Sequence, residues 1–131
     1  MDVERLAEGL WRWTAPPEPG GVYYEAPGAV VLFDPLLPAG EEEKFLAYLD
    51  RDLERLGLPV SILLTAPSDE RSAPFLRERY GANDRIPESV EAYPIEERKA
   101  YFIRPQRALV VNALDRSAAI ADLPVVRVLV S

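Results

Sequence analysis

Histidine and cysteine are both absent from this chain of 131 residues, and each absence excludes a class of chemistry. Without cysteine there is no disulfide framework, no thiolate nucleophile and no thiolate zinc site. Without histidine as well, zinc and similar metals lose both of their usual protein ligands, and haem and iron–sulfur clusters lose theirs. A bound metal would have to be a hard ion such as Mg²⁺, Mn²⁺ or Ca²⁺, held by carboxylates and carbonyls. We therefore expect no cofactor.

Positive charge and long apolar runs are scarce too. The formal net charge is −7, which argues against nucleic-acid binding because contact with the phosphate backbone needs a basic surface. No run of residues approaches the roughly 18 apolar positions that a membrane-spanning helix needs. The first residues, Met1–Arg5, lack the basic and apolar parts of a signal peptide. We expect a cytoplasmic protein with neither nucleic acid nor membrane as a partner.

Apolar residues make up 48% of the chain and charged residues 28%, as in an ordinary globular protein. At this length the sequence is expected to fold as one domain over residues 1–131. Apolar runs and alternation predict strands at Gly9–Thr14, Val22–Glu25, Val30–Phe33, Ser61–Leu64, Val90–Tyr93, Ala100–Ile103, Ala108–Val111 and Val125–Val130. Helical spacing predicts helices at Glu41–Leu56 and Ala73–Tyr80, with one or two helical turns within Ser117–Leu123.

The two longer helices carry clear start and stop signals. In the first, Phe45 and Leu49 belong to an apolar stripe at helical spacing, and Gly57 is a typical stop residue. Ser72 is expected to cap the second helix. The loop Ala66–Arg71 then lies between the end of a strand and the start of a helix, where α/β proteins commonly bind ligands.

Polar residues follow two strands of the buried type. Val30–Phe33 runs into Asp34, and Ser61–Leu64 continues through Thr65 into the loop Ala66–Arg71. This order resembles the metallo-β-lactamase superfamily, in which the loop after the second of these strands reads Thr-His-x-His-x-Asp-His and binds one or two metal ions. The resemblance covers nearly the whole chain. It implies an α/β fold of the α+β kind, a reduced αββα sandwich with mixed sheets, shortened at its C-terminal end.

Several phrases of the sequence carry this resemblance. GLWRWTAP is similar to the opening strand of the family, and VYYEAPGAVVLFDPLLP to the hairpin that ends in a structural aspartate, here Asp34. ILLTAPSDERSAPFLRERYGA takes the place of the metal-binding loop and the helix after it. RALVVNAL resembles the strand before the metal-bridging aspartate, and LPVVRVLVS the late strand that leads into His-Gly.

The resemblance puts other residue types where the family has its metal ligands. The positions of the three loop histidines are taken, in order, by Ala66, Ser68 and Arg71. Glu70 replaces the loop aspartate, and the bridging aspartate falls at Asn112 or Ala113. Such a hydrolase needs a metal to bring the pKa of bound water to about 7. Because imidazole is missing and Arg71 would repel a cation, we do not expect this chemistry.

The leading hypothesis is a metal-free, non-catalytic domain with a binding, regulatory or assembly role. No residue is predicted to be catalytic or to bind a metal. The remnant loop is the expected contact surface for an unknown small molecule or protein. Its candidate ligand-binding residues are Asp34, Thr65, Ser68, Asp69, Glu70, Arg71 and Asn112. Structural roles are the alternative, with Asp34 accepting backbone N–H groups and Asp69 and Glu70 favouring the start of a helix.

The rival hypothesis is a hydrolase of esters or phosphoesters that uses Mg²⁺ or Mn²⁺. Its metal would be held by Asp34, Asp69, Glu70 and Asp115, of which at least three must converge. Ser68 is a weak candidate nucleophile because no histidine is present to act as its base. A decayed gene product without a selected function is a third alternative.

Aromatic residues are concentrated in the first hairpin, at Trp11, Trp13, Tyr23 and Tyr24. They either line a pocket or a dimer surface, or they are ordinary half-buried strand residues. A shortened fold would also expose a sheet edge or an apolar face, which self-association would cover. We therefore expect a homodimer.

Overall fold

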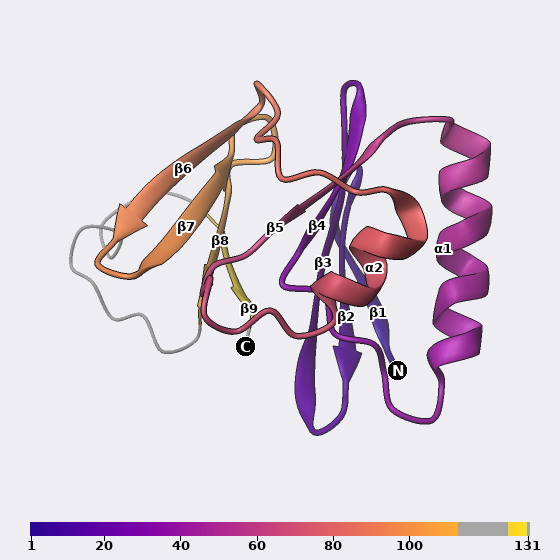
Figure 1. The fold of residues 1–131 in the computed structure, drawn as a ribbon. Coiled ribbons are helices and arrows are strands. Elements are labelled where there is room, and N and C mark those ends of the chain that lie inside the picture. The colour runs from indigo at the N-terminus through magenta and orange to yellow at the C-terminus, as the bar shows by residue number, and fades with distance from the viewer. Residues whose placement is uncertain (113–125, 131) are drawn as a thin grey trace.

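The computed structural model describes residues 1–112 and 126–130, with side chains up to residue 111 (Figure 1). The helices are α1 (Glu42–Leu56) and α2 (Ala73–Tyr80). The strands are β1 (Val3–Ala7), β2 (Leu10–Ala15), β3 (Glu18–Ala26), β4 (Ala29–Phe33), β5 (Val60–Leu63), β6 (Val90–Ile95), β7 (Arg98–Ile103), β8 (Ala108–Asn112) and β9 (Val126–Val130). The helical turns expected within Ser117–Leu123 lie outside the described residues.

The strands form two sheets of mixed direction. The first has the order β1-β2-β3-β4-β5 and the second the order β6-β7-β8-β9. The β4–β5 and β8–β9 pairs are parallel, and the other pairs are antiparallel. The mixed sheets implied by the sequence resemblance are therefore confirmed.

The two sheets pack face to face, and their facing side chains form one core layer. Its buried members include Leu10, Val22, Tyr24, Val31, Phe33, Leu63, Tyr101, Ile103 and Val110. All four residues of Val30–Phe33 are fully buried, because alternate positions of β4 face the second sheet and the helices. The prediction that Val30–Phe33 is a strand of the buried type is confirmed.

Both helices cover the other face of the first sheet, as Figure 1 shows. The buried members of this second layer are Trp13, Tyr23, Val30, Leu32, Phe45, Leu49, Val60, Ile62, Ala73 and Leu76. The layers therefore follow the order helices, first sheet, second sheet. None of the described helices is long and apolar enough to span a membrane.

The outer face of the second sheet is where the fourth layer of an αββα sandwich would lie. Within residues 1–112 and 126–130, no helix covers this face. Ala100, Leu109 and Val111 alternate with the inward residues Tyr101 and Val110 and so point away from the first sheet, yet all three are buried. The apolar face that a shortened fold was expected to expose is thus not exposed at these positions.

The helices match their predicted bounds closely. α1 begins one residue later than expected and ends at Leu56 as predicted. Gly57 caps it, with φ 64° and its N–H donated to the Leu53 carbonyl at 2.9 Å. Ser72 occupies the N-cap position of α2, but its side chain makes no capping hydrogen bond. Its Oγ accepts instead from the Leu37 N–H at 2.9 Å, which corrects the predicted cap.

The first strands differ from the sequence prediction. β1 was not predicted, because Val3, Glu4 and Arg5 are all exposed and carry no apolar alternation. The second strand was predicted only from Val22, yet β3 already begins at Glu18. Its glycines serve close packing, since a Cβ at Gly20 would lie only 2.1 Å from Cδ1 of Trp13.

Candidate functional site

Asp34 connects the ends of the parallel strands β4 and β5. Its side chain is buried, and its backbone has φ 47°, a left-handed conformation that aspartate tolerates better than most residues. Oδ1 accepts the backbone N–H of Thr65 at 2.8 Å, and Oδ2 accepts the Thr65 hydroxyl. The Asp34 N–H in turn donates to the Leu63 carbonyl at 3.0 Å. The pair therefore fixes the start of the loop after β5.

Arg71 ties the far end of the same loop to the rest of the sheet. Its Nη1 donates to the Asp34 carbonyl at 2.6 Å, and its Nη2 donates to the Pro19 carbonyl. Burial lowers the pKa of Arg71, and the negative charges of Asp34, Asp69 and Glu18 oppose this. The guanidinium thus supplies a fixed positive charge where the loop meets the beginning of β3.

Ser68, Asp69 and Glu70 lie on the outside of the loop and are exposed. The Asp69 N–H donates to the Ala66 carbonyl at 2.9 Å, and the Glu70 carbonyl accepts the N–H of Ala73 at 2.8 Å. The structure thus brings Asp34, Thr65 and Arg71 together and leaves the other three loop residues facing solvent. Their role in ligand binding stays a prediction.

Asn112 is the last residue of β8 and pairs with Val130 of β9. The side chain of Asn112, and the residues Ala113 and Asp115, lie outside the described part of the chain. The position that corresponds to the bridging aspartate of the family therefore lies at the end of β8, and its side chain is not described.

Tyr101 completes the base of the loop and was not predicted as part of the site. It belongs to β7, and its hydroxyl donates to the Leu64 carbonyl at 2.9 Å. Burial raises its pKa to about 12, and the charge of Asp34 adds to the effect. The N–H of Lys99 donates to the Thr65 carbonyl at 2.8 Å. A tyrosine at an inward position of a strand was the available signal, since its hydroxyl needs a partner when buried.

The metal site of the resembled family does not fit the residues present. The histidine positions hold Ala66, Ser68 and Arg71, which offer no imidazole. The Asp34 carboxylate is engaged by Thr65, and the Arg71 guanidinium would repel a cation. In residues 1–112 and 126–130, no three acidic residues gather into a group that could hold a metal ion. Asp34, Asp69 and Glu70 thus do not converge, and Asp115, the fourth acid of the rival hypothesis, lies outside the described residues.

A pocket of about 500 Å³ lies between α1 and the strands β1–β3, on the helix side of the first sheet. It is lined by Met1, Val3, Trp11, Trp13, Tyr23, Glu25, Lys44, Phe45, Tyr48, Leu49, Asp52 and Arg55. Because α1 lies across the beginning of the first sheet, side chains from residues 1–25 meet side chains from residues 44–55 here. No pattern in the sequence alone brings these two groups together.

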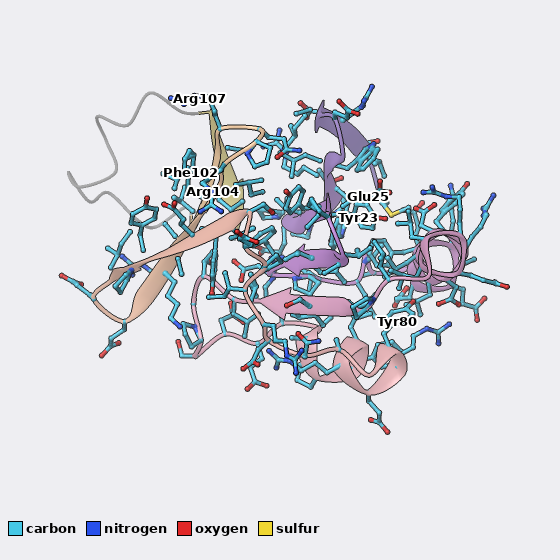
Figure 2. The ribbon with its side chains drawn as sticks, turned by 90° about the horizontal axis from the view of Figure 1, so that it is seen from above. Tyr23, Glu25, Tyr80, Phe102, Arg104 and Arg107 are labelled. Atoms are coloured by element: carbon cyan, nitrogen blue, oxygen red, sulfur yellow. The ribbon has the colours of Figure 1, made fainter. Side chains whose placement is uncertain are left out.

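Polar groups of the pocket form a chain from the sheet to the helix. Tyr23 and Glu25 project from the same side of β3 toward α1 (Figure 2). The Tyr23 hydroxyl donates to Oε1 of Glu25 at 3.0 Å, and Nη2 of Arg55 donates to the same oxygen at 3.3 Å. Arg55 also lies 3.7 Å from Oδ1 of Asp52. Burial and the neighbouring carboxylates strongly raise the pKa of Tyr23.

The aromatic residues of the first hairpin divide between this pocket and the core. Trp11, Trp13 and Tyr23 line the pocket, as one of the two predicted alternatives had it. Tyr24 faces the other way, into the core between the sheets, where its hydroxyl and that of Ser89 are hydrogen bonded at 2.9 Å. Glu25, Asp52 and Arg55 were not among the predicted site residues.

Comparison with known proteins gives matches in structure alone. No protein-family model matches the sequence, and no curated protein does. The DIM-1 metallo-β-lactamase matches with a TM-score of 0.61 at 10% identity, over 94% of this chain and 74% of its own. A metallo-β-lactamase from Erythrobacter litoralis in its mono-zinc form, described as NDM_FIM-1 like, matches with 0.55 at 13% identity, over 92% and 75%.

A third solved structure, that of VMB-1, matches with a TM-score of 0.58 at 10% identity, over 89% of this chain and 71% of its own. Identities this low describe the arrangement of the backbone and leave the chemistry to the residues of each protein. The two sheets and the pair of helices on one face agree with this likeness. The chain therefore has a metallo-β-lactamase-like fold.

Proposed function

We propose that this chain is a ligand-binding domain that needs no metal ion and catalyses no reaction. The observation that supports the proposal is that both ends of the loop between β5 and α2 are held by hydrogen bonds within the chain. The carboxylate of Asp34 accepts hydrogen bonds from Thr65, and the guanidinium of Arg71 donates to the carbonyls of Asp34 and Pro19. A loop held by its own hydrogen bonds does not depend on metal ligation for its shape.

In this proposal the exposed residues of the loop, Ser68, Asp69 and Glu70, are free to contact a small molecule or a protein. The role is binding, regulation or assembly, and the self-association expected from the sequence belongs to the same proposal. A cytoplasmic location is also proposed from the sequence.

Thermal unfolding of chelator-treated protein tests the independence from metal. Melting temperatures are measured with chelator and then with an excess of Zn²⁺, Mn²⁺, Mg²⁺ or Ca²⁺. An ion that binds only the folded chain, at about a hundred times its Kd, stabilises it by about 2.7 kcal/mol, which amounts to several degrees in Tm. We expect no shift with any ion. The Erythrobacter litoralis protein, known in a mono-zinc form, is the positive control.

A hydrolysis assay on p-nitrophenyl acetate and bis-p-nitrophenyl phosphate, run with the same ions, accompanies the melts. We expect no rate above buffer with ion. The double variant Ala66→His, Ser68→His is the matched comparison, since it returns two imidazoles to the loop at partly or fully exposed positions. A Zn²⁺ shift that appears only in this variant would show that the missing imidazoles are the reason for metal independence.

The rival Mg²⁺ or Mn²⁺ hydrolase makes the opposite prediction. It requires a melting shift and a rate with one of these ions, and both must disappear in Asp69→Ala. That result would contradict the proposal, whichever residues outside the described part of the chain complete the site.

A further inference from the structure

The pocket between α1 and β1–β3 is separate from the loop after β5 and has aromatic rings on both walls. Trp11, Trp13 and Tyr23 come from the sheet, and Phe45 and Tyr48 come from α1. The rings of Trp11 and Tyr23 meet edge to face with centroids 5.5 Å apart, and those of Trp13 and Phe45 lie 4.8 Å apart. The volume of about 500 Å³ falls within the usual range for small ligands, roughly 300–1,000 Å³.

Charged groups of both signs line this pocket: the carboxylates of Glu25 and Asp52, the side chains of Lys44 and Arg55, and the N-terminal ammonium of Met1, which pairs with Glu41 at 2.6 Å. Burial raises the pKa of the Tyr23 hydroxyl, and the charge and hydrogen bond of Glu25 and the charge of Asp52 add to it, against the opposing charge of Arg55. Arg55 is held between the two acids, at 3.3 Å from Glu25 and 3.7 Å from Asp52. Lys44 is exposed and follows three consecutive glutamates at the start of α1, which offset its charge. Arg55 and the N-terminal ammonium, two of the three cations at this pocket, are therefore already paired with carboxylates.

Glu25 retains an acceptor that the protein does not use. Oε1 receives both the Tyr23 hydroxyl and the Arg55 guanidinium. Oε2 makes no hydrogen bond to any described residue, although the side chain is only 23% exposed. A half-buried carboxylate oxygen beside aromatic faces is the combination that recognises organic ammonium groups, by charge-assisted contact and cation–π attraction.

We propose that this pocket binds a small organic ammonium ion, with the apolar body against Trp11, Trp13 and Phe45 and the nitrogen beside Oε2 of Glu25. This inference rests on the proposed function, because it assumes a binding role for the domain. Asp52 also lines the pocket and adds a second negative charge.

Three probes of similar size and different charge test the inference on the whole chain. They are benzyltrimethylammonium, its uncharged carbon isostere neopentylbenzene, and the anion benzenesulfonate. Tryptophan fluorescence reports binding directly, because the chain has two tryptophans and both line the pocket. We expect benzyltrimethylammonium to bind at least tenfold more tightly than either other probe, and to bind less tightly as salt is added.

Glu25→Gln is the decisive variant, since it removes the charge and keeps the shape. We expect about a tenfold loss of affinity for benzyltrimethylammonium and an unchanged affinity for the uncharged probe. Glu54→Gln is the matched control, because it removes the same charge from an exposed position of α1 that does not line the pocket. Tm values of both variants show that the fold is kept.

Equal affinity for all three probes, or an equal loss in both glutamine variants, would overturn the ammonium assignment. A preference for benzenesulfonate would overturn it as well and point to Lys44 and Arg55. Binding of none of the probes would remove the pocket as a site. None of these results bears on whether the domain needs a metal ion, which the thermal unfolding experiment tests separately.

Discussion

The carboxylate of Asp34 holds together two strands that share no turn. Because β4 and β5 are parallel, their ends lie side by side, and Thr65 presents both an N–H and a hydroxyl to Asp34 there. Thr65 is 0% exposed, so water cannot replace a lost partner. The stability of the loop therefore depends on one carboxylate.

Asp34→Ala is expected to lower the free energy of unfolding by about 3 kcal/mol, because it leaves two buried donors of Thr65 without an acceptor. Urea denaturation measures the change. Asp69→Ala is the control, since this acid is exposed and its removal should cost about 0.5 kcal/mol or less. Equal effects of the two substitutions would contradict a structural role for Asp34.

Tyr101 predicts how stability changes at alkaline pH. Its pKa is raised from 10.0 to about 12, and that of Tyr80 is raised to about 12 as well. Since the unfolded chain releases these protons at lower pH than the folded one, the stabilisation is fully present below pH 10 and is lost as the pH rises through 12. Urea denaturation between about pH 9 and 12 should show the decline. Tyr101→Phe should make it shallower, and an unchanged slope would refute the assignment.

At the scale of elements, the sequence was most informative where local signals decide the structure. Phe45, Leu49 and Gly57 fix α1 to within one residue, and α2 was predicted at its observed bounds. β1 exists because it pairs with β2, a tertiary effect with no local signal. For the pocket, the sequence offered only one alternative role for Trp11, Trp13 and Tyr23. Its charged residues were missed because Asp52 and Arg55 reach the sheet only through the placement of α1.

Gly20 of β3 lies very close to Trp13 of the neighbouring strand β2. A Cβ there would lie 2.1 Å from Cδ1 and 2.7 Å from the carbonyl oxygen of Trp13. Gly20→Ala should therefore displace Trp13, lower stability by roughly 1–3 kcal/mol and shift the tryptophan emission. Gly28→Ala is the comparison, because a Cβ there meets nothing within 4 Å and only the positive φ of 90° is strained. An emission spectrum unchanged in Gly20→Ala would contradict this packing.

The whole molecule keeps a backbone arrangement at 10% to 13% sequence identity to metallo-β-lactamases. The fold was accessible from the sequence because the order of apolar strands and the aspartate at the end of β4 resemble those of metallo-β-lactamases. The candidate loop was located as well, but its internal bonding was not, because Arg71 reaches the Pro19 carbonyl 52 residues away. Such contacts follow from topology, which a local pattern does not encode.

Self-association is the prediction that belongs to this scale. Among the described strands, β1 and β6 are the first of their sheets and have one neighbour each, and Val3 on β1 is 61% exposed. Pairing of such an edge with a second copy would cover it. Light scattering over a range of concentrations should therefore find a dimer, and Val3→Lys should weaken it. A strict monomer at the highest concentration would refute the homodimer.

α1 rests on the first sheet through side chains, and none of the described backbone hydrogen bonds joins the helix to a strand. Its attachment therefore consists of side-chain packing and the hydrogen bond from Arg55 to Glu25, and it depends on what fills the space beneath the helix. A molecule in the pocket would contact both α1 and the first sheet and so hold the helix against the sheet. Amide protons of α1 would then exchange with solvent more slowly when the pocket is filled. The exchange rate of these amides would therefore report binding even if the shape of the helix does not change.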